Sequence, residues 1–124
     1  MTRDEVMQWV RAYEEGWRAE NRTAVERLFT EDAKYLRSPY ASPLAGHSAI
    51  RDFWVDEEEG GSNFTMTAEP IAVEGSSAVV RLQVRYGEPV NQEYRDLWVL
   101  HFAADGRVQH FEEWAYWPDK GHTV

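Results

Sequence analysis

The spacing of hydrophobic residues changes character near the middle of the chain. In the first half, apolar residues recur every three or four positions, the spacing of helices that bury one face. A helix is predicted over residues 3–19, because Thr2 and Glu5 have the spacing of a capping box. Two shorter helices are expected to be capped by Asn21 and Ser48. The faces expected to be buried are Val6, Trp9 (or Val10), Tyr13 and Trp17, then Val25, Leu28 and Phe29, then Ile50, Phe53 and Trp54.

The second half alternates apolar and polar residues, the pattern of strands with one buried face. Strands are predicted over residues 34–38, 64–73 (interrupted at Pro70), 80–86, 92–103 and 107–117. Turns are expected at residues 59–62, 74–76, 87–91 and 105–106, and a loop at 39–46. This order of elements indicates an α+β fold, in which three N-terminal helices pack on a strongly curved, mostly antiparallel sheet.

The length and composition indicate a single acidic domain. Its 124 residues suffice for a single domain spanning 1–124, of which residues 118–124 are expected to form a loose tail. A hydrophobic content of 43% excludes intrinsic disorder. Twenty-two acidic and 13 basic residues give a net charge of -9, so nucleic acid and membranes are not expected partners. The absence of cysteine excludes disulfides, and the charged N-terminal segment favours a cytoplasmic protein.

Several short motifs occur in a characteristic order along nearly the whole chain. They are residues 28–33 (LFTEDA), 38–39 (SP), 46–50 (GHSAI), 102–108 (FAADGRV) and 112–114 (EEW). In this order they resemble the SnoaL-like branch of the nuclear transport factor two-like superfamily. The resemblance implies a cone of curved sheet, closed by helices, around an apolar pocket. Relatives include ketosteroid isomerases, polyketide cyclases, scytalone dehydratases and limonene epoxide hydrolases, so the fold alone implies no single activity.

The final hairpin decides which residues can share a site. A two-residue turn at 105–106 places Ala104 opposite Arg107, and therefore Trp98 opposite Glu113. One face of the hairpin then carries Asp96, Trp98, Leu100, Phe111 and Glu113, and the other carries Leu97, Val99, His101, His110, Glu112 and Trp114. The resemblance favours the first set as the inner face. A slip of one residue in the register would exchange the two faces.

Asp96, Glu113 and Tyr13 are the candidate catalytic residues. The two carboxyl groups are diagonal neighbours in this register, and an apolar pocket would raise their pKa values toward neutrality. They could then act as base and acid, although each could instead pair with an arginine. The resemblance implies that Tyr13 donates a hydrogen bond to a substrate oxyanion. The alternative is a core aromatic residue whose hydroxyl is satisfied by the protein.

The sequence departs from the ketosteroid isomerases at two catalytic positions. Ser38 stands where the resemblance implies a catalytic base, and Trp98 falls where it implies a second oxyanion donor. A serine hydroxyl without a nearby base accepts no proton at neutral pH, so isomerisation by that mechanism is not expected. The adjacent Arg95 and Asp96 supply residue types of the epoxide hydrolases but point to opposite faces of a strand.

A dehydratase mechanism remains open. Tyr35 and Tyr40 could reach the pocket mouth, but His101 and His110 would face the pocket only after a register slip. Facing each other, with Glu112 nearby, the two histidines have the residue types of a metal site, although a simple polar pair on the outer surface is expected.

Aromatic residues are abundant enough to line a flat, apolar cavity. The residues expected to line the ligand pocket are Trp17, Tyr35, Ser38, Tyr40, Trp54, Leu82, Trp98, Phe111 and Trp117. The expected ligand is a small apolar or aromatic molecule, with neither cofactor nor metal. On the outer face, Leu97 opposite Trp114 forms an apolar pair that needs cover, so a homodimer through this face is predicted.

Two functions follow from the sequence. The first is a cofactor-independent acid–base enzyme of the isomerase, cyclase, dehydratase or hydrolase type, acting on a small hydrophobic substrate. The second is a non-catalytic ligand-binding or interaction domain of the same fold.

Overall fold

The computed structural model describes residues 1–56 and 63–118 of the chain, with the side chains of residues 55 and 56 left undescribed. The elements in chain order are α1 (Arg3–Arg18), α2 (Ala24–Leu28), β1 (Phe29–Leu36), β2 (Leu44–Ala45), α3 (Gly46–Asp56), β3 (Phe64–Glu74), β4 (Ser77–Tyr86), β5 (Gln92–Phe102) and β6 (Val108–Tyr116). The predicted turn at 59–62 and most of the predicted tail, residues 119–124, lie outside the described residues.

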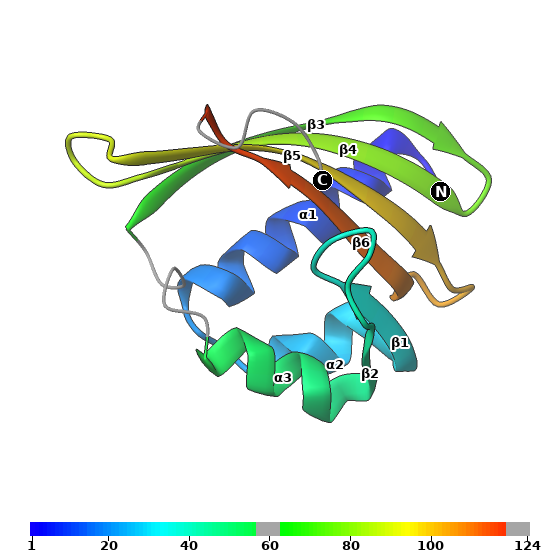
Figure 1. Ribbon diagram of the computed structural model, residues 1–124. Helices are drawn as coiled ribbons and strands as arrows, with labels where there is room; N and C mark the ends of the chain where they lie inside the picture. Colours follow the sequence, from blue (N-terminus) through cyan, green and yellow to red (C-terminus); the bar gives the residue numbers. More distant parts are fainter. Residues whose placement is uncertain (57–62, 119–124) are drawn as a thin grey trace.

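The strands form one six-stranded sheet in the order β2-β1-β6-β5-β4-β3. All neighbouring strands are antiparallel except β1 and β6, which run parallel. Figure 1 shows strands β3 to β6 crossing above α1, with α2 and α3 on the opposite side of that helix. The α+β fold is confirmed. The edge strands β2 and β3 do not pair in the described part of the chain, so the sheet bends around α1 without closing into a complete barrel.

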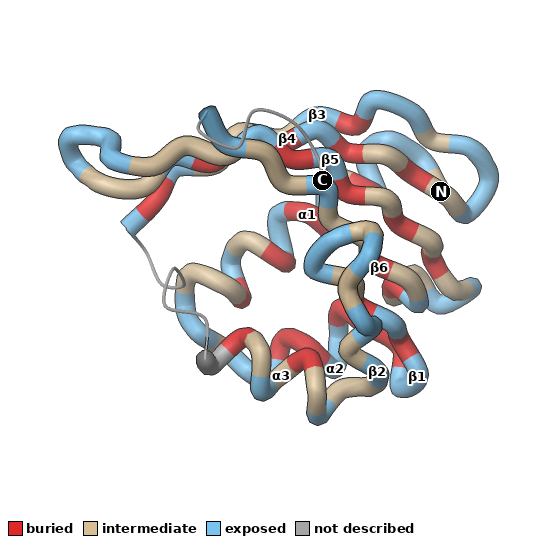
Figure 2. Tube along the Cα trace, viewed as in Figure 1, coloured by how far each residue is buried: buried red, intermediate tan, exposed pale blue. Residues whose placement is uncertain are grey.

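Helix α1 begins at the predicted capping box. The Thr2 hydroxyl accepts a hydrogen bond from the Glu5 amide at 3.1 Å, and the Thr2 amide donates to the Glu5 carboxylate at 2.9 Å. These bonds satisfy backbone amides that the first helical turn leaves without partners. Figure 2 shows buried segments recurring along α1, and its buried residues are Val6, Trp9, Val10, Tyr13 and Gly16, of which Gly16 packs against α2.

The second and third helices differ from their predicted starts. Asn21 does not cap α2, because its side chain accepts hydrogen bonds from the amide and hydroxyl of Thr23 instead. Phe29 is buried as predicted, but it is extended and begins β1, which starts well before the predicted residue 34. Helix α3 begins at Gly46, whose φ of 85° turns the chain into the helix, so Ser48 lies within the first turn.

The pairing of β5 with β6 confirms the predicted register. Trp98 lies opposite Glu113, and Asp96 lies opposite Ala115. The loop itself differs from the prediction, because the Ala103 amide donates to the Arg107 carbonyl and leaves three residues between them. A register shift beyond His101 then restores the predicted pairing along the rest of the hairpin. In β3 the register shifts next to Pro70, as expected for a residue without an amide hydrogen.

An aromatic core fills the space between α1 and the sheet. Trp9 packs edge-on against Phe29, Trp98 and Phe102, and its indole N–H donates to the Leu28 carbonyl at 2.9 Å. Such contacts add specific ring geometry to the burial of large apolar surfaces. They fix α1 beneath β5 and β6, which positions the site described next.

Candidate functional site

A cavity of about 130 Å³ lies between the C-terminal half of α1 and the inner face of the sheet. It is built from residues that alternate on the inner faces of β3, β4, β5 and β6, because the strand pairing places them side by side. The described residues that line it are Tyr13, Glu14, Trp17, Tyr35, Phe53, Phe64, Met66, Val84, Tyr86, Tyr94, Asp96, Trp98, Glu113 and Ala115.

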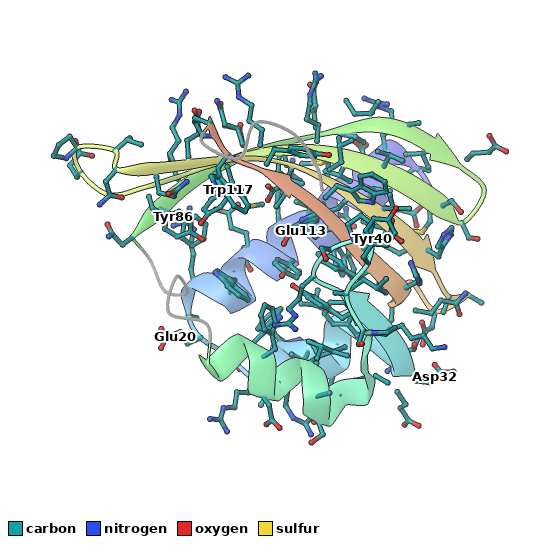
Figure 3. The ribbon with its side chains drawn as sticks, in the orientation of Figure 1. Glu20, Asp32, Tyr40, Tyr86, Glu113 and Trp117 are labelled. Carbon is teal, nitrogen blue, oxygen red and sulfur yellow. The ribbon has the colours of Figure 1, made fainter. Side chains whose placement is uncertain are left out.

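The cavity brings together the two predicted carboxyl groups. Asp96 is buried on β5, and Glu113 extends from β6 toward α1 (Figure 3). The strand register makes them diagonal neighbours, which places their Cβ atoms roughly 7–8 Å apart. The Trp98 indole N–H donates to a Glu113 carboxylate oxygen at 3.0 Å and so orients this side chain. The arrangement can bind a polar group between two acids or pass a proton from one position of a ligand to another.

The third candidate, Tyr13, reaches the same cavity from α1. Its hydroxyl lies 2.7 Å from the Tyr35 hydroxyl in a buried hydrogen bond, and its ring is stacked on Phe111. Burial, together with the nearby Tyr35 phenol and the Glu113 carboxylate, raises the pKa of Tyr13 well above its ordinary value. Tyr13 is therefore a neutral phenol at physiological pH. Either hydroxyl can be the donor in this hydrogen bond.

Several residues predicted to line the pocket lie elsewhere. Trp54, Leu82 and Phe111 are buried behind the cavity wall, because α3, β4 and β6 carry them into the core. Ser38 and Tyr40 are exposed on the loop after β1, where the Ser-Pro turn directs the chain over the surface.

Trp117 also lies outside the cavity. It follows the end of β6 and is 38% exposed, and its ring lies against Tyr94 with the centroids 5.8 Å apart. Figure 3 shows it near Tyr86 at one end of the sheet, whereas Tyr40 lies across the molecule.

Sequence reasoning missed several lining residues, among them Glu14, Tyr86 and Tyr94. The strand alternation contained a signal for the two tyrosines, because Tyr94 is two residues before Asp96 and Tyr86 is two after Val84. Extending each inward-facing series to the strand ends would have included them. Glu14 gives no such signal, since it lies at the edge of the buried face of α1.

The outer face of the hairpin carries the two histidines. The His101 Nδ1 atom lies 2.8 Å from the Ser77 hydroxyl, and the His110 Nε2 atom lies 3.3 Å from a Glu112 carboxylate oxygen. Within residues 1–56 and 63–118, no three histidine or acidic side chains are grouped so that they could hold a metal ion. None of the described helices is long and apolar enough to span a bilayer.

The fold and the site define an α+β protein with a cavity between a helix and a curved sheet, and this cavity brings together Asp96, Glu113 and Tyr13. The sequence profile of the SnoaL-like domain family matches residues 10–111. The chain therefore belongs to the SnoaL-like domain family. A comparison with curated proteins gives no match.

Solved structures of similar fold come from several bacteria. A candidate SnoaL-like polyketide cyclase from Jannaschia sp. CCS1 is 18% identical, with a TM-score of 0.72 over 90% of this chain and 84% of its own. A candidate ketosteroid isomerase from Kribbella flavida is 18% identical, with a TM-score of 0.70 over 98% of this chain and 83% of its own. An NTF-2 like protein of unknown function from Burkholderia xenovorans LB400 is 13% identical, with a TM-score of 0.72 over 98% of this chain and 95% of its own. At these identities the likeness establishes the fold alone.

Proposed function

We propose that the protein binds a small, largely apolar molecule in this cavity and transforms it by acid–base catalysis without a cofactor. The observation that carries the proposal is the convergence of Tyr13, Asp96 and Glu113 on one aromatic-walled cavity. Aromatic walls with a few convergent polar groups are typical of small-molecule sites. The names of the similar structures, a polyketide cyclase and a ketosteroid isomerase, are consistent with chemistry of this kind.

Proton transfer next to a carbonyl is the reaction that best suits these groups. The Glu113 carboxylate would accept a proton from the carbon beside the carbonyl, leaving an enolate whose oxygen accepts a hydrogen bond from a neutral phenol, Tyr13. The protonated Glu113 would return the same proton at a second carbon, which completes an isomerisation or precedes ring closure. Asp96 is a further acidic residue in the cavity wall, beside Glu113.

The size of the cavity limits the substrate. A cavity of about 150 Å³ is enough for benzene, and this one measures about 130 Å³. A single ring or a short branched chain therefore comes close to filling the cavity, whereas a steroid would have to extend beyond it. Ser38 lies exposed on the loop after β1, so it supplies no base for the steroid mechanism.

The proposal is tested first by ligand binding and then by turnover. Purified protein is heated with monocyclic aromatics, terpene epoxides, short hydroxy acids and steroids. A melting temperature above that of the protein alone identifies the ligand class that binds. For that class, Glu113→Gln is expected to lower kcat at least about a hundredfold, the lower bound typical of a lost acid–base group. Because glutamine keeps an acceptor for the Trp98 indole, binding and melting temperature should change little.

Glu112→Gln is the matched control, since this neighbour points to the opposite face of β6. Equal kcat values for the two variants would contradict the catalytic proposal. Ligand binding without turnover in the wild type would favour the second candidate function, a non-catalytic ligand-binding domain.

A further inference from the structure

The cavity wall is acidic as well as aromatic. Of the 14 described lining residues, three are acidic (Glu14, Asp96 and Glu113) and none is basic. Arg18 pairs with the first of these acids, because its Nε atom lies 2.8 Å from the Glu14 carboxylate. Its guanidinium lies over the Phe64 ring, 4.0 Å from the centroid, and another of its nitrogens donates to the Phe64 carbonyl. This arginine is therefore held at the edge of the cavity by its own partners.

Asp96 lies between two aromatic residues along β5. Tyr94 and Trp98 lie two residues before and after it, on the same inner face of β5, and both line the cavity. Eight of the described lining residues are aromatic, and the Trp98 ring lies 4.7 Å from the ring of Tyr13. The faces of such rings carry partial negative charge and attract cations most strongly where water is excluded. Asp96 places a buried carboxyl group among these rings.

We propose that the ligand carries an ammonium group, either a protonated amine or a quaternary amine, which binds at Asp96 between the rings of Tyr94 and Trp98. The inference rests on the proposed function, since it names the class of molecule that the cavity takes. In this proposal Asp96 binds the ammonium group of the ligand, and Glu113 transfers the proton. An ammonium group is attracted both by a carboxylate and by the faces of the aromatic rings, whereas an anionic ligand is repelled by them. The net charge of -9 also attracts a cationic ligand to the protein.

Matched probes that differ in charge but not in shape test the inference. Benzylammonium, benzyl alcohol and benzoate share one ring, and choline differs from 3,3-dimethylbutan-1-ol mainly in charge. Binding is measured by calorimetry and by quenching of tryptophan fluorescence, at low and at high salt. Each cation is expected to bind at least about tenfold more tightly than its neutral counterpart, the gain of a desolvated cation–π contact joined to an ion pair. Benzoate is expected to bind most weakly.

Two variants locate the charge recognition within the cavity. Asp96→Asn keeps the side-chain volume, and it should abolish the preference for the cation. Tyr94→Leu removes one ring and should reduce the preference even if the asparagine variant does not fold. The control Glu112→Gln removes one negative charge from the outer face and should leave the preference unchanged.

The outcomes separate the inference from the function on which it rests. Binding of benzyl alcohol as tight as that of benzylammonium would overturn the ammonium inference and leave the proposed function standing. A preference for cations that survives Asp96→Asn would overturn the assignment of this subsite. If no probe of any charge binds, and the wider ligand panel also fails, both proposals are wrong.

Discussion

Tyr13 shows what burial does to a single ionisable side chain. Because its pKa is raised in the folded protein, the unfolded chain loses this proton first as the pH rises. The contribution of Tyr13 to stability is therefore complete below pH 10 and declines above it, by up to about 1.4 kcal/mol per pH unit for one proton. Tyr13→Phe is expected to flatten this alkaline decline, measured as the free energy of unfolding in urea between pH 8 and 11.

Tyr40→Phe provides the control for that measurement, because Tyr40 is 92% exposed. It should leave the alkaline slope as it is in the wild type. Equal slopes for Tyr13→Phe and the wild type would show that the Tyr13 phenol ionises in the folded protein as readily as in the unfolded chain.

At the scale of secondary-structure elements, Gly16 sets how closely α1 and α2 approach. A Cβ atom at this position would lie 2.8 Å from the Ala24 Cβ and 3.3 Å from the Trp54 ring. Alanine favours a helix by about 1 kcal/mol over glycine, but overpacking a core costs typically about 1–3 kcal/mol. We expect Gly16→Ala to lower the free energy of unfolding in urea, since the backbone of α2 cannot move away as easily as a flexible side chain.

The exposed Ala12 on the same helix supplies the comparison, because Ala12→Gly reports helix propensity without a change in packing. If Gly16→Ala raises the stability by as much as Ala12→Gly lowers it, the contact between the two helices does not restrict this position.

The elements also show how far local sequence patterns determine this fold. Capping residues and alternation predicted α1 and strands β3 to β6, because both signals arise from neighbouring residues. The correct register of the final hairpin rests on two departures that cancel. The loop holds three residues instead of two, and the register shift beyond His101 takes up the difference.

What the sequence could not supply are the relations between distant segments. Nothing near β1 indicates that it pairs in parallel with β6, since that contact depends on the whole chain. The site also depends on contacts between segments that are distant in the sequence. Alternation placed Phe111 and Glu113 on the same face of the hairpin, and the family resemblance identified that face as the inner one. Only the position of α1 decides which of them borders a cavity and which is covered by rings.

For the whole molecule, we propose that a second copy of the chain covers the outer face of the sheet. Leu97 and Trp114 lie opposite each other there and are 40% and 36% exposed. The face also carries ion pairs, Arg81 with Glu69 and Arg85 with Glu93, so both charge signs are available to meet their counterparts across a twofold axis.

Leu97→Glu is expected to convert the dimer into a folded monomer, because it places two carboxylates in an apolar contact. Sedimentation velocity measures the mass, and Val90→Glu, in the exposed turn before β5, should remain dimeric. A monomeric wild type at micromolar concentration would contradict the proposal.

The central place of β6 has a consequence for how the protein is made. Val108–Tyr116 is the last described strand to leave the ribosome, yet it lies between β1 and β5. Until it emerges, β1 and β2 have no edge to join, and part of the sheet face that covers the buried side of α1 is missing. The first half of the nascent chain must therefore wait with its aromatic residues uncovered, a state that favours aggregation and the help of chaperones.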